Sequence, residues 1–197
     1  MTLPASEIPL LSHPTDEPSV FKPESLLARA ADMRGASADN IPNCCILDGD
    51  NELGEVAQSL FGAKQNSAWP CFHTTMLTVE LGGMEMCLIS GTVGAPFAVL
   101  IAEQLIALGC RHIVGYSSAG SVSGSIPLPY FMVPDRAIRD EGTSYHYLPP
   151  ETTIETQSEF SAVLAKNATE CGLAVHRGTT WTTDAPYRET QTQIDRH

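Results

Sequence analysis

The apolar residues of this chain recur in two rhythms, one typical of helices and one typical of buried strands. Helical spacing, with apolar residues three and four positions apart, is found over 23–35, 52–61, 95–108 and 155–171. Short apolar runs bounded by turn residues predict strands over 43–47, 75–81, 84–89, 112–116, 130–133 and 173–180. This alternation predicts an α/β protein built on a largely parallel or mixed sheet.

Glycine and proline mark the boundaries between these elements. Gly82-Gly83 separates two predicted strands, and two adjacent glycines permit the positive φ angles of a tight hairpin turn. Prolines at positions 4, 9, 14 and 18 rule out a long regular element near the amino terminus. We therefore expect an extended arm over residues 1–22, followed by one α/β domain over 23–197.

Composition narrows the possible partners. The 197 residues carry 23 acidic and 11 basic side chains, for a formal net charge of −12. No run of lysine or arginine offsets this charge, so the chain is a poor binder of nucleic acid or of anionic membranes. The most apolar window, 95–108, is shorter than the roughly 20 residues of a membrane span, and no positively charged signal-peptide start is present. We expect a cytoplasmic protein with neither partner.

The six cysteines do not form a recognisable metal or disulfide pattern. They stand at positions 44, 45, 71, 87, 110 and 171, without a C-x-x-C pair. These spacings predict buried, reduced thiols that act as small apolar side chains, and they predict no metal site.

Four loops that follow predicted strands are rich in small or hydrogen-bonding residues. They cover 48–50, 90–94, 117–121 and 182–188. In an open α/β sheet, ligands collect where loops leave the carboxyl ends of strands, and glycine lets backbone N–H groups approach an anion. Each loop taken alone is equally compatible with an ordinary turn, and none matches a Walker loop or a dinucleotide fingerprint.

The loops and their surroundings together resemble one family. Ser90-Gly91-Thr92-Val93-Gly94-Ala95-Pro96, ahead of an apolar helix, is similar to the second glycine loop of the nucleoside phosphorylase family, in its uridine phosphorylase branch. Ser118-Ala119-Gly120-Ser121-Val122 resembles the next loop of that family. The stretches 139–150 (RDEGTSYHYLPP) and 184–190 (DAPYRET) agree in order and spacing. The resemblance covers roughly residues 20–197.

This resemblance implies a fold and an activity. The fold is a three-layer αβα sandwich with a mixed central sheet, here lacking the last strand–helix units. The activity is that of a pentosyltransferase, which cleaves the N-glycosidic bond of a nucleoside with phosphate. The partners are then a nucleoside, inorganic phosphate as the only co-substrate, and copies of the chain itself in a dimer or hexamer.

The resemblance also assigns roles to the loops. Ser118 and Thr92 are the catalytic candidates, for contact with the ribose or the attacking group. Further substrate-binding candidates in the first three loops are Gly49, Asp50, Gly91, Ser117 and Gly120. The base-binding candidates are Asp184, Pro186, Tyr187 and Arg188. A surface ion pair between Arg188 and Glu189 is the competing interpretation at that loop.

The chain departs from the family at its phosphate arginines. Leu53 and Gly115 stand where two of them are expected, and a third, lent by a neighbouring subunit, would fall near Phe72. Each arginine–phosphate contact is a charge-assisted hydrogen bond of about 1.5–3 kcal/mol. Their loss leaves two hypotheses: water replaces phosphate, as in a nucleoside hydrolase, or the substrate or activity differs.

A second departure is that residue 197 precedes the family unit whose carboxylate binds the ribose hydroxyls. A catalytically weak or inactive nucleoside-binding protein, or a partner that completes an oligomer, is therefore the alternative function. The stretch that contains Arg139, Glu141 and His146 also has two interpretations. Either Arg139 and Glu141 form a structural ion pair with His146 in the core, or His146 serves the sugar site or a subunit interface.

Overall fold

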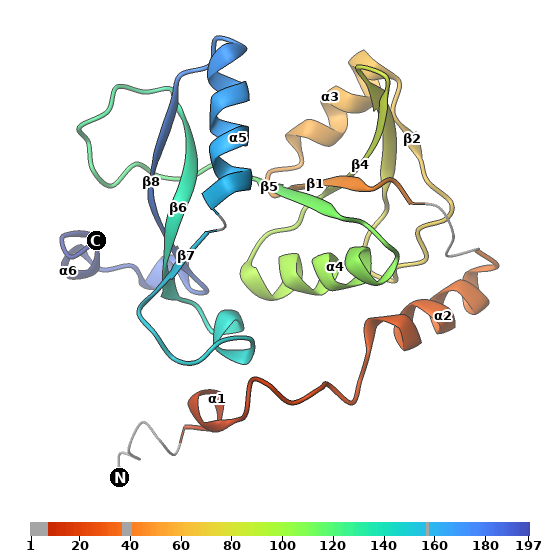
Figure 1. Ribbon diagram of the computed structural model, residues 1–197, viewed down its shortest axis with the longest axis horizontal. Coiled ribbons are helices and arrows are strands. Elements are labelled where there is room, and N and C mark those ends of the chain that lie inside the picture. Colours follow the sequence, from red (N-terminus) through yellow and green to blue (C-terminus); the bar gives the residue numbers. More distant parts are fainter. Residues whose placement is uncertain (1–7, 37–40, 157) are drawn as a thin grey trace. The chain divides into compact units, whose positions relative to one another are not determined.

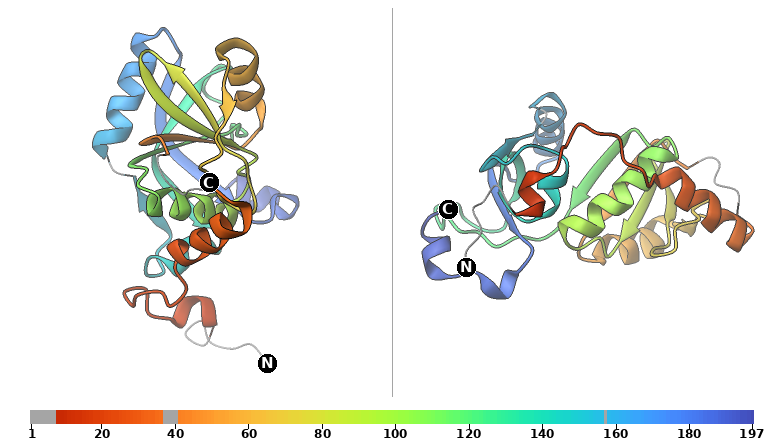
Figure 2. Two further views of the ribbon diagram at one scale, coloured as in Figure 1. Left: turned by 90° about the vertical axis from the view of Figure 1, so that its right-hand side faces the viewer. Right: turned by 90° about the horizontal axis from the view of Figure 1, so that it is seen from below.

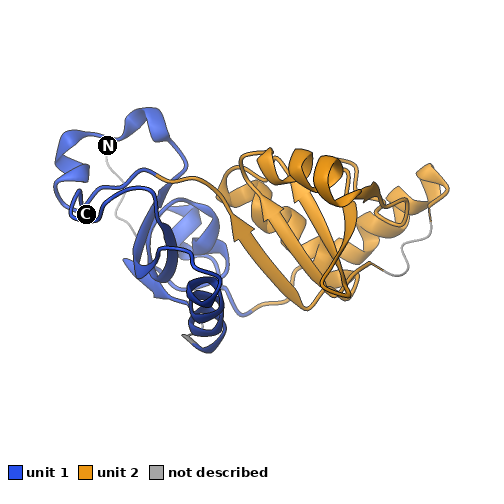
Figure 3. Cartoon of the chain, turned by 90° about the horizontal axis from the view of Figure 1, so that it is seen from above, with its two compact units in different colours: residues 1–16, 120–197 blue, residues 17–119 orange. Residues whose placement is uncertain are grey.

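The computed structural model describes residues 8–36, 41–156 and 158–197. These residues form two compact units (Figure 3). One runs from Glu17 to Ala119, and the other combines the described residues up to Asp16 with Gly120–His197. The one-domain prediction over 23–197 stays a prediction, because a division into compact units does not by itself separate domains.

The unit 17–119 is built on a five-stranded mixed sheet (Figure 1). Strand β1 (Cys44–Asp48) lies between two parallel neighbours, β4 (Met84–Ser90) and β5 (His112–Tyr116). Strand β3 (Leu77–Leu81) runs antiparallel to β4, and the short β2 (Lys64–Gln65) completes the order β2-β3-β4-β1-β5. Gly82 and Gly83 join β3 to β4 with φ angles of 60° and 79°, which confirms the predicted hairpin.

Helices cover both faces of this sheet (Figures 1 and 2). On one face, Ile101 and Leu105 of α4 (Ala95–Ala107) pack in one core with Cys45 and Cys87, and α2 (Pro23–Arg34) lies against α4. On the other face, α3 (Glu52–Phe61) packs through Ala57 in a core that contains Val79. Side chains alternate between the faces of a strand, so this arrangement gives three layers. The predicted αβα fold class with a mixed sheet is confirmed.

The unit that contains Gly120–His197 holds a smaller mixed sheet. Strand β6 (Phe131–Asp140) pairs with the antiparallel β7 (Thr153–Glu155) and the parallel β8 (Val175–Thr183), and α5 (Ser158–Glu170) packs against β6 and β8. The sequence indicated a strand over 130–133 only. Polar and charged residues occupy much of 134–140, so the apolar pattern ends before the strand does.

Short elements complete this unit. They are α1 (Pro9–Ser12), η2 (Thr143–His146), η3 (Pro186–Arg188) and α6 (Gln191–Ile194). Helix α1 is a correction to the extended arm predicted over 1–22, since proline is tolerated in the first helical turn; residues 1–7 lie outside the described part. A correction also applies to His146, which is not a core residue but is exposed and stacks on His13 with 5.0 Å between the ring centroids.

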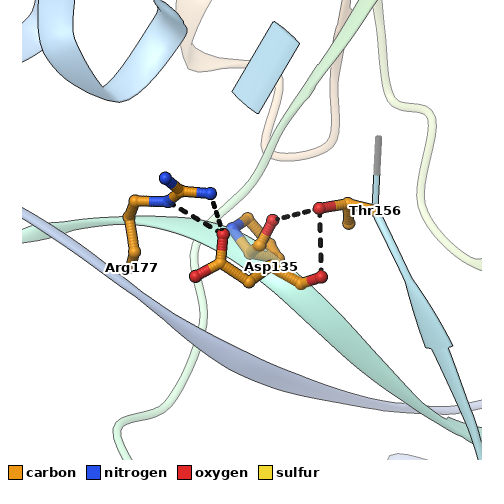
Figure 4. A network of polar contacts seen from close by, with 4 residues as sticks. Asp135, Thr156 and Arg177 are labelled. Atoms are coloured by element: carbon orange, nitrogen blue, oxygen red, sulfur yellow. Dashed lines mark hydrogen bonds and ion pairs between the residues drawn. The ribbon is translucent and has the colours of Figure 1, made fainter. Parts of the chain in front are cut away.

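A β-bulge interrupts β6 between Pro134 and Arg136 and is held by polar contacts (Figure 4). The Thr156 hydroxyl donates to the carbonyl oxygens of Pro134 (2.8 Å) and Asp135 (3.1 Å). Arg177 of β8 donates through Nε to the Asp135 carboxylate at 2.8 Å. Proline has no N–H for the ladder, so these side-chain bonds replace the strand pairing that the bulge removes.

All six cysteines are free thiols, but they are not all buried. Cys45, Cys71, Cys87 and Cys110 are buried, Cys44 is half-buried, and Cys171 is exposed. Cys171 therefore corrects the prediction of uniformly buried thiols. Within the described ranges, no helix has both the length and the apolar character to cross a membrane.

Candidate functional site

Three of the four predicted loops meet at one edge of the five-stranded sheet. Strands β4, β1 and β5 are parallel neighbours, so their carboxyl ends lie side by side. In the strand register, Asp48 at the end of β1 pairs with Ser90 at the end of β4 and with Tyr116 at the end of β5. The loops 48–51, 90–94 and 117–119 therefore leave the sheet together (Figure 1). We call this place the carboxyl edge.

The buried side chain of Asp48 joins segments of the carboxyl edge by hydrogen bonds. It is 0% exposed and accepts hydrogen bonds from Asp50 N (3.2 Å), Gly54 N (3.3 Å) and the Ser90 hydroxyl (2.8 Å). Its backbone oxygen accepts from Thr92 N at 3.2 Å. A buried charge is costly unless hydrogen-bonded donors replace its hydration, and these donors come from the loop after β1, the first turn of α3 and the end of β4. Asp48 therefore fixes three segments of the edge in one geometry.

Glycine allows the close approaches that this geometry needs. A Cβ atom at Gly49 would lie 2.7 Å from the Ser117 hydroxyl oxygen, and one at Gly54 would lie 2.5 Å from the Ser90 hydroxyl oxygen. Both distances are shorter than non-bonded carbon and oxygen atoms tolerate. The Gly49 N–H donates to the Tyr116 carbonyl oxygen at 2.8 Å, which joins the loops after β1 and β5.

The Asp50 carboxylate faces the loop after β5. It accepts from the backbone N–H of Ser118, from the Ser118 hydroxyl at 3.2 Å and from the Ser117 hydroxyl at 3.5 Å. Both serines are exposed, whereas Asp50 is half-buried. The carboxyl edge thus presents two hydroxyls and a backbone N–H, with a carboxylate of the same chain bound to them.

Thr92 and Gly91 sit differently in the edge. Gly91 has a φ of 76°, in the left-handed region, and a Cβ there would lie 3.1 Å from the Asn51 Oδ1 atom. Asn51 itself has a φ of 66° and is the N-cap residue of α3. Thr92 is buried, with 7% of its surface exposed. Of the two catalytic candidates, Ser118 is therefore the one with a solvent-accessible side chain.

The base-loop candidates belong to the other compact unit, and so does Gly120, a further substrate-binding candidate. Asp184 accepts a hydrogen bond from Gly142 N at 2.7 Å, so its carboxylate holds the turn before η2. Pro186 and Arg188 lie in η3 and are exposed, and Tyr187 between them is 100% exposed. The substrate contacts assigned to these four residues stay predictions.

The buried Arg139 side chain also holds the segment around η2 by hydrogen bonds. Its guanidinium donates to the Ser144 hydroxyl (2.8 Å) and to the carbonyl oxygens of Pro149 (2.7 Å) and Leu148 (3.2 Å). Glu141 accepts from the backbone N–H and the hydroxyl of Ser144, so the two charged residues meet at that serine. Arg139 and Glu141 are both buried. Among the described residues, Arg139 and Glu141 form no direct ion pair, which corrects the predicted one; both instead hold the turn through Ser144, in a structural role.

Two of the three positions expected for phosphate arginines hold uncharged residues in the structure, and an arginine from elsewhere in the chain lies near the third. Leu53 lies in α3 and Gly115 in β5. Near Phe72, however, the structure places Arg34 of α2, with Cζ 5.6 Å from the ring centroid and Nη2 donating to the Phe72 carbonyl oxygen at 3.4 Å. A scan along the chain between Lys64 and Arg111 cannot find this arginine, because it comes from 38 residues upstream.

Sequence reasoning missed Asp48 and Ser90 as builders of the carboxyl edge. A signal for Asp48 was present, because a charged residue directly follows the apolar run Cys44–Leu47. Such a residue is either the first of a loop or a buried group with partners. For Ser90 no comparable signal exists, since small polar residues end many strands.

Burial raises the pKa of thiols in the core of the 17–119 unit. Burial raises the pKa of the Cys110 thiol to about 11, with the nearby Cys87 as a second cause. A hydrogen bond with Cys87, together with burial, raises the pKa of Cys45 far above its ordinary range. These thiols stay protonated at neutral pH and are poor nucleophiles or metal ligands. Within the described ranges, no three His, Cys, Asp or Glu side chains are grouped to hold a metal ion.

Comparisons with known proteins agree with this arrangement. A family model described as the phosphorylase superfamily matches residues 44–197. The uridine phosphorylase of Thermococcus kodakarensis is 27% identical over 142 residues, which are 72% of this chain and 51% of that protein. The uridine phosphorylase of Escherichia coli strain K12 is 26% identical over 156 residues, 79% of this chain and 59% of that protein. The chain thus spans between half and three fifths of these relatives, and the predicted family resemblance is confirmed.

Proposed function

This chain belongs to the phosphorylase superfamily, and we propose that it cleaves the N-glycosidic bond of a nucleoside at the carboxyl edge of its five-stranded sheet. The observation that carries this proposal is the meeting of three loops at that edge, where Asp48 holds the loops after β1 and β4 and Asp50 binds the loop after β5. A preorganised group of hydroxyl and N–H donors is what a reaction with changing charge requires. The uridine phosphorylase relatives support a nucleoside as the substrate class.

The proposed reaction forms one bond and breaks one bond at the anomeric carbon. An oxygen of the attacking group, either phosphate or water, bonds to that carbon while the carbon–nitrogen bond breaks. The base leaves with the electron pair of the broken bond, and the proton given up by the attacking group is taken by the base. The products are the free base and ribose 1-phosphate, or the free base and ribose.

In this proposal the Ser118 hydroxyl and backbone N–H orient the attacking group or the ribose. Thr92 lines the same edge and shapes it, with its N–H held by the Asp48 carbonyl oxygen at 3.2 Å. Tyr187 and Arg188, which belong to the other unit, stay base-binding candidates by the family resemblance alone, for stacking and for donation to a carbonyl oxygen as negative charge develops there. In this proposal the chain accelerates the reaction mainly by positioning the reacting groups.

The deciding experiment incubates the chain with a panel of purine and pyrimidine nucleosides, with and without phosphate. Free base and sugar product are both measured by chromatography. Base release in either arm supports glycosidic cleavage, and the sugar product identifies the attacking group. Ser118→Ala should reduce release at least tenfold, whereas Ser59→Ala, which removes a hydroxyl bonded within α3, should leave it unchanged. Absence of release with every nucleoside contradicts the proposal.

Arg188 provides a test of the base side. We expect Arg188→Ala to weaken nucleoside binding severalfold in calorimetry while the unfolding midpoint stays within about 1 °C, because the side chain is exposed. Arg196→Ala removes another exposed arginine near the carboxyl end and should change neither quantity. Nucleoside affinity of Arg188→Ala equal to that of the wild type would remove this residue from the site.

The second candidate function is a nucleoside-binding protein with little or no turnover. It is favoured by the uncharged residues Leu53 and Gly115 at the expected arginine positions. Calorimetry with nucleosides and free bases, run beside the product assay, separates the two: binding without product supports this second function. Mass measurement of the assembly tests the related proposal that the chain forms a homo-oligomer.

A further inference from the structure

We propose that the Asp50 carboxylate is an internal competitor for oxyanions at the carboxyl edge, and that it favours water over phosphate as the attacking group. By internal competitor we mean an anionic side chain of the protein that occupies the donors an external anion would use. The choice of attacking group rests on the proposed function, but the anion competition is a property of the folded chain alone.

The donor set at this edge is of the kind that binds phosphate. Ser118 contributes its backbone N–H and its hydroxyl, and Ser117 contributes a second hydroxyl. Backbone N–H groups and hydroxyls of a small-residue loop are common phosphate ligands. Here all three donate to the two carboxylate oxygens of Asp50, so a phosphate oxygen must displace that carboxylate to bind them.

Asp50 is held in this position by the backbone on both sides. Its own N–H donates to the Asp48 carboxylate at 3.2 Å, and the preceding Gly49 N–H donates to the Tyr116 carbonyl oxygen at 2.8 Å. The next residue, Asn51, adopts the left-handed conformation and is the N-cap of α3. The carboxylate therefore meets the serines without a search through many loop conformations, and an incoming anion must work against a preorganised contact.

The charges around the edge favour the same outcome. Asp48 lies directly below the loop with its own carboxylate, and Glu52 follows in the first turn of α3. The two positions where family arginines are expected, Leu53 and Gly115, carry no charge. Phosphate at these serines would face the Asp50 and Asp48 carboxylates without those cations, whereas a water molecule can donate to a carboxylate.

A simpler role for Asp50 is a structural clamp between the loops after β1 and β5. The clamp and the competitor differ in what happens when the charge is removed but the acceptor is kept. Asp50→Asn keeps an oxygen that can accept from Ser118, whereas Asp50→Ala removes both the charge and the acceptor. A clamp predicts no gain in anion binding for either variant.

The experiment titrates inorganic phosphate into the full chain and its variants by isothermal calorimetry at neutral pH. We expect the wild type to bind phosphate weakly, Asp50→Asn at least threefold more tightly and Asp50→Ala at least tenfold more tightly. The double variant Asp50→Ala/Ser118→Ala should lose that gain if the serine donors hold the anion. Near-ultraviolet circular dichroism checks that each variant is folded, and Asp50→Asn alone decides if Asp50→Ala does not fold.

The proposal is overturned if the folded Asp50 variants bind phosphate no more tightly than the wild type, or if their gain survives the loss of Ser118. It is also overturned if base release by the wild type requires phosphate. That last result would leave glycosidic cleavage intact. Conversely, gains in phosphate affinity without any base release would support the competitor and contradict the proposed reaction, so the two can fail separately.

Discussion

The two compact units of this chain are stabilised by different kinds of contact. Within the described ranges, every buried apolar side chain except Ala165 lies between Glu17 and Ala119. The unit that contains Gly120–His197 instead buries polar groups, among them Arg139 and Glu141 with their shared contact at Ser144. The 17–119 unit (orange in Figure 3), called the first unit below, therefore depends mainly on the hydrophobic effect. The unit with Gly120–His197 (blue), called the second unit below, depends on strand pairing and charge-assisted hydrogen bonds.

This difference bears on the candidate site. The loops of the carboxyl edge rest on strands whose side chains are packed between two helical layers, so the donors of that edge sit on a rigid support. The base-loop candidates rest on a sheet with few buried apolar neighbours. We expect the carboxyl edge to keep its geometry without ligand, and the 184–188 loop to adjust more readily.

The chain carries a separate optical probe in each unit. Trp69 is buried in the first unit and donates to the Thr74 hydroxyl at 2.8 Å. Trp181 lies on β8 of the second unit and donates to Asp140 at 3.1 Å. Since the sequence has two tryptophans, Trp181→Phe and Trp69→Phe each leave one reporter, and urea unfolding can be followed in each unit.

The largest expected effect comes from truncating a core leucine. Leu105→Ala in α4, at 0% exposure, should lower the free energy of unfolding seen by Trp69 by about 3–4 kcal/mol, because it removes apolar contacts and leaves a cavity. Leu164→Ala in α5, where the side chain is 37% exposed, should cost the Trp181 transition less than about 1 kcal/mol. Equal losses of unfolding free energy for the two variants would show that the units do not differ in how much they depend on buried apolar side chains.

A smaller effect is expected from the buried arginine of the second unit. Arg139→Ala removes three donated hydrogen bonds and the contact with the Tyr145 ring, whose centroid lies 4.3 Å from Cζ. We expect a loss of about 2–3 kcal/mol in the Trp181 transition. Arg136→Ala breaks an ion pair with Glu155 whose arginine side chain is 51% exposed, and should cost about 0.5 kcal/mol. A cost for Arg139→Ala as small as this would contradict the structural role of Arg139.

The prediction with the smallest effect at neutral pH is a pH dependence of the first unit. In the unfolded chain Cys110 ionises near its ordinary pKa of 9.0, whereas burial in the folded chain raises that pKa to about 11. The folded state thus holds the proton longer, so its stabilising contribution is complete below pH 9.0 and is lost as the pH rises toward about 11. Cys110→Ala should flatten the pH slope of the Trp69 transition, and Cys171→Ser should not. An unchanged slope in Cys110→Ala would assign the effect to other groups.

Most elements of the first unit could be predicted to within about two residues of their bounds, but the short β2 was not predicted. The helix over Glu52–Phe61 and the strand over His112–Tyr116 have the predicted bounds, and the Gly82-Gly83 hairpin is confirmed. These elements have clear signals because their apolar residues face one buried surface with a fixed period. In the second unit, β6 extends to Asp140 through polar residues, and the short β7 has no apolar pattern. Strand pairing overrides local pattern there.

By itself, the sequence determined the α/β class, the loops that end the parallel strands and the family to which the chain belongs, because these depend on local periodicity and on motifs with regular spacing. Only the tertiary structure decided which polar groups meet. The bond from Ser90 to Asp48 spans 42 residues, and the bond from Ser118 to Asp50 spans 68. Such partners are brought together by the order of strands in the sheet, and no pattern within a single segment records that order.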